Sequence, residues 1–156
     1  MIKMTRIDHR LLHGQVAVAW AHALQVDCIL IVNDDVAHDE FQKSLMKMAK
    51  PHGVKLIFKS IAATADAINL GKTDTYSVYV IVKTILDAQT LCELCPSIQY
   101  INLGLSEIKE HAQQLGRSIY VNEDEIAALK AMSKKGIQIV MQQTPSDRGV
   151  DVVSIL

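Results

Sequence analysis

Short apolar runs alternate with amphipathic segments along most of the chain. Residues 28–32 and 76–83 are the most continuous apolar runs, which is typical of strands buried on both faces of a sheet. Val16, Trp20 and Ala23 recur at the spacing i, i+4, i+7, which indicates one face of a helix. The same reasoning predicts strands at 1–7, 28–32, 54–59, 76–83, 98–103, 118–121 and 137–142, and helices at 14–24, 33–50, 61–70, 84–95, 108–114 and 123–135.

This alternation predicts an α/β fold: a single open, mostly parallel sheet of about seven strands with helices on both faces. The longest apolar strand, 76–83, is expected near the centre of the sheet. No linker, repeat or low-complexity tract interrupts the pattern, so residues 1–156 are expected to form one domain. Sites in such sheets form at the carboxyl ends of strands, which draws attention to the loops 8–14, 33–35, 83–84 and 102–105.

The segment 33–50 is expected to form one helix that packs on the sheet. Asn33, Asp34 and Asp35 offer N-caps at its start. One apolar face of this helix, at helical spacing, is expected to be its buried stripe: Phe41, Leu45 and Met48.

Composition narrows the classes of function. Hydrophobic residues make up 49% of the chain and charged residues 21%, with a formal net charge of −1. This balance is typical of a globular protein and gives no general attraction to nucleic acid. The apolar runs are far shorter than the roughly 20 residues of a membrane span. The N-terminus lacks the apolar core of a secretory signal, so we expect a cytoplasmic protein.

Cys92 and Cys95 form a lone C-x-x-C pair. A zinc site would need a second such pair or two histidines at a suitable spacing, and the chain offers neither. The pair falls late in a predicted helix, so a packing role is favoured over a redox or metal role.

The stretch between the first predicted strand and helix concentrates the chemistry of the chain. It contains His9 and His13 together with Arg6, Arg10 and Asp8. A neutral imidazole is a good nucleophile near pH 7, and guanidinium groups match the oxygens of a phosphoryl group. Spacing alone leaves three interpretations open: a phosphate or anion site, ordinary turn residues, or two metal ligands without a third. It also leaves His9 and His13 as equal candidates for a nucleophile.

Neighbouring residues fit phosphate chemistry as well. Gly14 would let backbone amides approach a phosphoryl group, and the free N–H groups at a helix start attract anions. Asp8 could hold an imidazole in one tautomer or orient an arginine. Arginines and backbone amides can neutralise the charge of a transferred phosphoryl group, so neither a metal nor a cofactor is expected.

The stretch Arg6-Ile-Asp-His-Arg-Leu-Leu-His-Gly-Gln-Val16 resembles the start of the IIB domains of the mannose/fructose/sorbose family of the bacterial sugar phosphotransferase system (PTS). The family pattern reads R-I-D-x-R-L-I-H-G-Q-V, and this chain departs from it only at Leu12. Asn102 and Gly104 belong to a further similar block and are expected to shape a turn beside the site. The similar blocks after the first are 31–37, 41–42, 82–84, 101–104 and 142–145.

The resemblance implies a phosphotransferase. In that family a phosphohistidine of a IIA protein or domain donates its phosphoryl group to the histidine that matches His13, at Nδ1. The IIB domain then phosphorylates a sugar that enters through membrane IIC and IID subunits, which would hold the chain peripherally at the inner membrane. The identity of the sugar and the oligomeric state, including a homo-oligomer, are left open.

The resemblance also ranks the supporting residues. Arg10 matches the arginine three positions before the histidine and is the best candidate for a phosphate ligand. Asp8 and Arg6 match the motif with less defined roles, and His9 falls at its variable position. Lys83 is either an additional cation at the rim or a solvated lysine at a strand end.

Two rival functions have the same fold class. A receiver-like signalling domain would be phosphorylated on an aspartate with magnesium, and Asp34-Asp35 and Lys83-Thr84 follow strands as such a site requires. A nucleotide- or flavin-binding module would need a glycine-rich phosphate loop, which this sequence lacks. Helix capping explains the two aspartates more simply, so the phosphohistidine carrier is favoured.

Overall fold

The computed structural model describes all 156 residues, and strands alternate with helices over most of the chain. The strands are β1 (Ile2–Asp8), β2 (Cys28–Val32), β3 (Lys55–Lys59), β4 (Val78–Val82), β5 (Tyr100–Leu105), β6 (Gln113–Gly116), β7 (Ile119–Val121), β8 (Gln138–Met141) and β9 (Val150–Asp151). The α-helices are α1 (Gly14–Leu24), α2 (Glu40–Met48), α3 (Ile61–Asn69), α4 (Ile85–Leu94) and α5 (Glu123–Lys134), and two 3₁₀ turns are η1 (Val36–His38) and η2 (Val152–Ile155).

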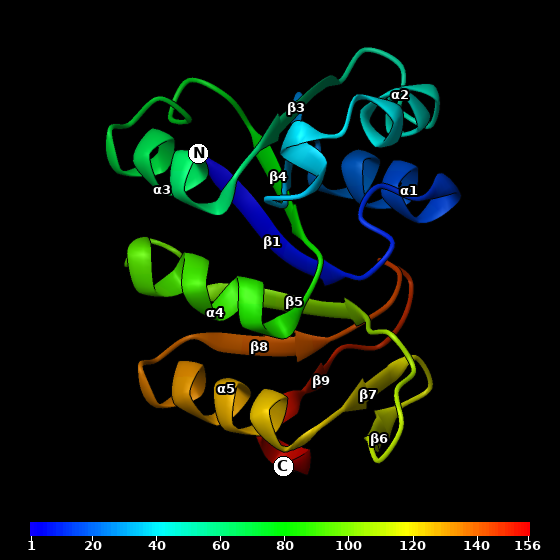
Figure 1. The fold of residues 1–156 in the computed structure, drawn as a ribbon, viewed down its shortest axis with the longest axis vertical. Helices are drawn as coiled ribbons and strands as arrows, with labels where there is room; N and C mark the ends of the chain where they lie inside the picture. The colour runs from blue at the N-terminus through cyan, green and yellow to red at the C-terminus, as the bar shows by residue number, and fades with distance from the viewer.

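Seven of the strands form one sheet in the order β3-β2-β4-β1-β5-β8-β9 (Figure 1). Every neighbouring pair is parallel except β8 and β9. The predicted α/β fold with a mostly parallel sheet of about seven strands is therefore confirmed. β4 lies next to β1, the middle strand, and all five of its side chains are buried, as expected for the most apolar run.

Helices cover both faces of the sheet. Figure 1 shows α3, α4 and α5 in a row, whereas α1 and α2 lie together elsewhere on the sheet. Two separate groups of buried side chains match this division. One contains Ala65, Leu91 and Leu129 from the row of three helices. The other contains Trp20 and Met46 from α1 and α2.

The turns and caps explain where several helices begin. The side chains of Ser60 and Thr84 accept backbone N–H groups at the starts of α3 and α4. Asn122 and Glu125 form a capping box at the start of α5. No helix combines the length and the apolar character needed to cross a membrane.

The segment 33–50 differs from its prediction. Asn33 accepts the N–H of Val36 and starts η1, and Asp39 rather than residues 33–35 caps α2. The expected buried stripe is wrong: Phe41, Leu45 and Met48 are 69%, 48% and 85% exposed.

The spacing of the apolar residues correctly identified one face of α2, but it did not show which face packs on the sheet. Each residue of a helix advances by about 100°, which turns Met46 away from the stripe of Phe41, Leu45 and Met48 by roughly 100° or more. Met46 is the buried residue of α2, so the apolar stripe faces solvent.

The region after β5 also differs from its prediction. The expected helix at 108–114 is wrong: residues 108–112 form a loop and a turn, and Gln113 and Gln114 begin strand β6, which pairs antiparallel with β7. Ser106 anchors the preceding loop: its N–H donates to the Ser118 carbonyl, and its Oγ accepts the N–H of Tyr120. The predicted strand 118–121 thus belongs to this hairpin, and the tail strand β9 completes the seven-stranded sheet instead.

Cys92 and Cys95 are both buried and free, and they pack in the larger of the two cores, as a packing role requires. Burial, with Cys95 nearby, raises the pKa of the Cys92 thiol to about 11. No three histidine, cysteine, aspartate or glutamate side chains lie close enough together to hold a metal ion.

Candidate functional site

The topology changes direction at the carboxyl ends of β1 and β4. These two strands are neighbours, but α1 follows β1 on one face of the sheet and α4 follows β4 on the other. Connections that leave two neighbouring strands toward opposite faces mark a topological switch point, and ligand-binding sites of open α/β sheets form there. The motif-bearing loop between β1 and α1 lies at this point.

Two buried leucines hold that loop in place. Leu11 and Leu12 are 4% and 5% exposed and pack in the same core as Trp20. Leu11 has a left-handed φ of 60°, a conformation that costs about 1–2 kcal/mol for a residue with a side chain. Its N–H donates to the Asp8 carbonyl at 2.9 Å. The loop is therefore a defined turn, and it presents the side chain of His13 to solvent.

The carboxylate of Asp8 is shared by two arginines. Its Oδ2 accepts Nη2 of Arg6 at 3.2 Å and Nη2 of Arg10 at 3.3 Å. Its Oδ1 accepts Nε of Arg10 at 3.3 Å and the Arg10 backbone N–H at 3.0 Å. The side chains of Arg6 and Asp8 are almost fully buried, whereas that of Arg10 is 26% exposed. Two guanidinium groups facing one carboxylate leave one positive charge in excess at this place.

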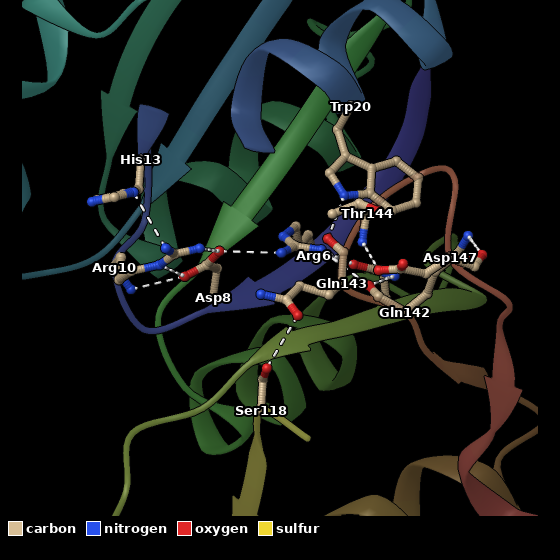
Figure 2. Close-up of polar contacts among 11 residues, drawn as sticks. Arg6, Asp8, Arg10, His13, Trp20, Ser118, Gln142, Gln143, Thr144 and Asp147 are labelled. Atoms are coloured by element: carbon tan, nitrogen blue, oxygen red, sulfur yellow. Dashed lines mark hydrogen bonds and ion pairs between the residues drawn. The ribbon is translucent and has the colours of Figure 1, made fainter. Parts of the chain in front are cut away.

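Arg10 also reaches the imidazole of His13. Its Nη1 lies 3.3 Å from His13 Nδ1, and Figure 2 shows His13, Arg10, Asp8 and Arg6 in one row. A guanidinium can only donate a hydrogen bond. A hydrogen bond between Arg10 and His13 requires the lone pair on Nδ1, so a neutral ring in this contact has its proton on Nε2.

The start of α1 completes an anion-binding arrangement. His13 occupies the N-cap position but makes no side-chain cap, and the first turn contains no acidic residue. The first backbone N–H groups of α1 are therefore free of intrahelical and capping partners. Gly14 has a φ of 47°, a left-handed conformation that glycine adopts without strain. Free amides and the helix dipole at this end favour a bound anion.

Arg6 is fixed from behind by the neighbouring strands. Its Nη1 donates to Asn102 Oδ1 at 2.7 Å and to the Gln142 carbonyl at 3.2 Å. A side chain at Gly104 would overlap the guanidinium of Arg6, so only glycine leaves room for it. The Trp20 ring lies on another side, 5.8 Å from the guanidinium carbon. The buried charge thus has polar or aromatic neighbours in several directions.

The structure brings together five of the six predicted site residues: His13, Arg10, Asp8, Arg6 and Gly14. Lys83 is exposed at the end of β4 and makes no hydrogen bond or ion pair with any of them.

His9 is distinct from His13. Its N–H donates to the Leu105 carbonyl at 3.1 Å, and its Nδ1 is buried without a partner. Among the two histidines, only His13 contacts the arginine cluster through its ring.

Of the two aspartates of the receiver-like alternative, Asp34 caps a helix. Asp34 accepts the N–H of Ile61 at 2.9 Å, at the start of α3. Burial raises the pKa of Asp87 at the start of α4, and Asp34 acts in the same direction.

Burial also raises the pKa of Tyr79, whose side chain is near Arg6 and Asp8, so Tyr79 remains a neutral phenol beside these charged residues.

The sequence did not reveal the contribution of the segment after β8. The Gln142 carbonyl accepts hydrogen bonds from Arg6 and from Asn102, and the Gln143 carbonyl accepts one from Trp20 at 3.0 Å (Figure 2). A backbone carbonyl carries no sequence signal. The only available clue was the similar block at 142–145, which gave no role to its members.

Comparison with known families decides the assignment. The family model described as the sorbose subfamily IIB component of the PTS matches residues 2–156. The chain belongs to this family of PTS IIB components. It is thus a component of a sugar phosphotransferase system, as the first loop suggested.

Relatives agree over the whole length. The PTS system fructose-specific EIIB component of Bacillus subtilis is 32% identical, over 99% of this chain and 95% of that protein. The PTS system mannose-specific EIIAB component of Escherichia coli is 28% identical over all of this chain, which spans 48% of that longer protein. The crystal structure of the IIBSor domain of the sorbose permease from Klebsiella pneumoniae superposes with a TM-score of 0.92 at 26% identity, over 99% of this chain and 94% of that one.

Proposed function

We propose that residues 1–156 form one IIB domain that accepts a phosphoryl group on Nδ1 of His13 and passes it to a sugar. The observation that carries this proposal is the contact of Arg10 Nη1 with His13 Nδ1 at the open start of α1. That contact leaves the lone pair of a neutral imidazole on Nδ1, the nitrogen that faces a guanidinium and lies beside the free amides. These are the groups that the transfer of an anionic phosphoryl group requires.

The donor is the phosphohistidine of a IIA protein or domain. The Nδ1 lone pair of His13 forms a new N–P bond while the N–P bond of the donor breaks. The donor ring takes the electron pair and leaves as a neutral imidazole, provided that its other nitrogen holds a proton. His13 keeps its proton on Nε2 throughout, so no base is needed in this step.

The acceptor in the second step is a sugar hydroxyl. Its oxygen forms an O–P bond while the His13 N–P bond breaks, and its proton passes to water. His13 leaves as a neutral imidazole, ready for another cycle. Neither of the two proposed steps uses a cofactor or a metal ion.

Each supporting residue has a defined part in the proposal. Arg10 turns its Nη1 from the Nδ1 lone pair to an oxygen of the arriving phosphoryl group. Amides at Gly14 and the next residues bind a second oxygen. Asp8 holds Arg10 in place, and Arg6 supplies the buried positive charge behind them. Lys83 acts at longer range, as an additional cation at the rim.

Partners follow from the same assignment. The IIA phosphohistidine is the donor, and the name of the E. coli mannose-specific EIIAB relative joins an A and a B component in one protein. Membrane IIC and IID subunits bring in the sugar and hold this chain at the cytoplasmic face of the membrane. The names of the relatives refer to fructose, mannose and sorbose, so the acceptor in this proposal is a sugar of that class.

The test is phosphorylation of the purified protein by a phosphorylated IIA partner. We expect wild-type protein to be labelled and His13→Ala to remain unlabelled while keeping its fold, because the side chain is exposed. His9→Ala is the matched control from the same loop and should still be labelled. The label should survive base and be lost in acid, as phosphohistidine is. A label that is lost in base would indicate an acyl phosphate and would support the receiver-like function instead.

A further inference from the structure

Asn102 occupies the centre of the polar network behind the site. It lies on β5, has no exposed surface, and is one of the few buried polar residues of the sheet. Its Oδ1 accepts Nη1 of Arg6 at 2.7 Å, and its Nδ2 donates to the Gln142 carbonyl at 3.0 Å. Both ends of the amide are thus used, and each partner admits only one orientation because a guanidinium cannot accept and a carbonyl cannot donate.

This amide decides where the Arg6 guanidinium lies. Arg6 and Asn102 face each other across the parallel pair β1 and β5. Gly104, two residues along β5, leaves the space that the guanidinium fills. With Nη1 held by Asn102 and the Gln142 carbonyl, Nη2 is directed at Oδ2 of Asp8, 3.2 Å away.

The position of Arg6 in turn affects Arg10. Oδ2 of Asp8 accepts from both arginines, so Arg10 does not have this oxygen to itself. A carboxylate divided between two cations holds each one less firmly than a carboxylate paired with one. Arg10 therefore stays oriented by Nε, while its Nη1 remains available to His13 and to a phosphoryl group.

We propose that Asn102 is a positioning residue for phosphoryl transfer: it fixes Arg6, and through Asp8 it keeps Arg10 poised over His13 Nδ1. The inference rests on the proposed function of His13. Asn102 itself touches neither the imidazole nor the phosphoryl group. Its effect is expected in the rate of the transfer step and not in the affinity for the donor, because it is buried away from any docking surface.

Asn102→Asp tests this with a nearly isosteric change. The new carboxylate competes with Asp8 for Arg6 and removes the excess positive charge of the cluster. We expect kcat for phosphorylation by IIA to fall about 10-fold or more, as for the loss of one electrostatic group, with KM for the donor unchanged. Asn33→Asp is the matched control: it adds the same charge in a buried asparagine at the end of β2, outside the network, and should change kcat less than about 2-fold.

A spectroscopic readout separates positioning from stability. In the wild type, the ring ¹⁵N shifts of His13 should report the tautomer with its proton on Nε2. In Asn102→Asp or Asn102→Ala, the tautomers should become mixed, whereas Asn33→Asp should keep the wild-type pattern. A folded Asn102 variant with wild-type kcat and wild-type ring shifts would overturn the inference.

Wild-type protein alone provides a measurement if both Asn102 variants fail to fold. In NMR spectra of the wild type, phosphorylation of His13 should change the chemical shift of the Asn102 side-chain amide. The shift of the Asn33 side-chain amide should stay the same. An Asn102 signal that does not move would reject the coupling. Absence of any label on wild-type His13 would instead refute the proposed function, so the two failures are distinguishable.

Discussion

Replacing Gly104 by alanine should disrupt the site without touching any charged residue. A Cβ at this position would overlap the guanidinium of Arg6, which lies in a fully buried part of the sheet. Arg6 would have to leave, and its hydrogen bonds to Asn102 and to the Gln142 carbonyl would be lost. Hydrogen bonds of a charged group contribute about 1.5–3 kcal/mol each, and breaking a buried ion pair costs about 3–5 kcal/mol. We expect Gly104→Ala to lower the free energy of unfolding by about 3–5 kcal/mol.

Chemical denaturation followed by circular dichroism measures this loss. Gly136→Ala is the control: a Cβ there meets no atom within 4 Å, but the residue has a φ of 88°. Gly136→Ala should lower the free energy of unfolding by only about 1–2 kcal/mol, the cost of alanine in a left-handed conformation. The folded fraction of Gly104→Ala should also accept phosphoryl groups more slowly, because Asp8 then holds Arg10 alone.

A double-mutant cycle with Arg6→Ala gives the result that would refute this reasoning. Once the guanidinium is absent, the new methyl group has space. Alanine in a strand is then favoured over glycine by about 0.5–1 kcal/mol, so Gly104→Ala should be neutral or slightly stabilising in that background. An equal loss of stability in both backgrounds would show that Arg6 is not the reason glycine is needed.

Further expectations concern charge, packing and pH. Arg10→Ala should slow phosphorylation of His13 by about 10²-fold, since one electrostatic donor is removed; an unchanged rate measured with labelled donor would remove Arg10 from the mechanism. Lys83→Gln should slow it by only about 2-fold at low salt and not at all at 1 M salt, where screening acts within about 3 Å. In α2, Met46→Ala should lower the free energy of unfolding by about 2–5 kcal/mol, but Met48→Ala by less than about 0.5 kcal/mol, and similar losses would contradict the orientation of the helix. Because burial raises the pKa of Cys92 from 9.0 to about 11, the folded state binds its proton more tightly. Its contribution to stability is present below pH 9 and is lost as the pH rises towards 11, so the melting temperature of wild type should fall further over this range than that of Cys92→Ala.

The sequence predicted most of the sheet because its central strands are apolar on both sides. The run at 76–83 became β4, and 28–32 is β2 without any shift of bounds. Such strands are buried whatever covers them, so their pattern is sufficient. The helix 14–24 also matches α1 residue for residue.

The errors arose where a local pattern had two physical solutions. The stripe Phe41, Leu45 and Met48 has helical spacing, but spacing does not say which side of a helix meets the sheet. The segment 108–114 lacks a strong signal of its own, and its hydrogen bonds depend on β7, which comes later in the chain.

The site was predictable in composition but not in arrangement. The motif identified His13, Arg10, Asp8 and Arg6, and the structure places all four in contact in one row. The role of Asn102 could not be predicted, because it depends on a pairing between strands almost a hundred residues apart. The motif block around Asn102 indicated a turn, whereas the structure places the residue within β5.

The most direct measurement is NMR of the ¹⁵N-labelled protein after phosphorylation by its IIA partner. The proposed function predicts one phosphorylated residue, His13, with phosphorus coupled to Nδ1 and a proton retained on Nε2. Phosphorus on Nε2, or on any other residue, would contradict the proposal that Arg10 directs the lone pair of His13 Nδ1 to the incoming phosphoryl group.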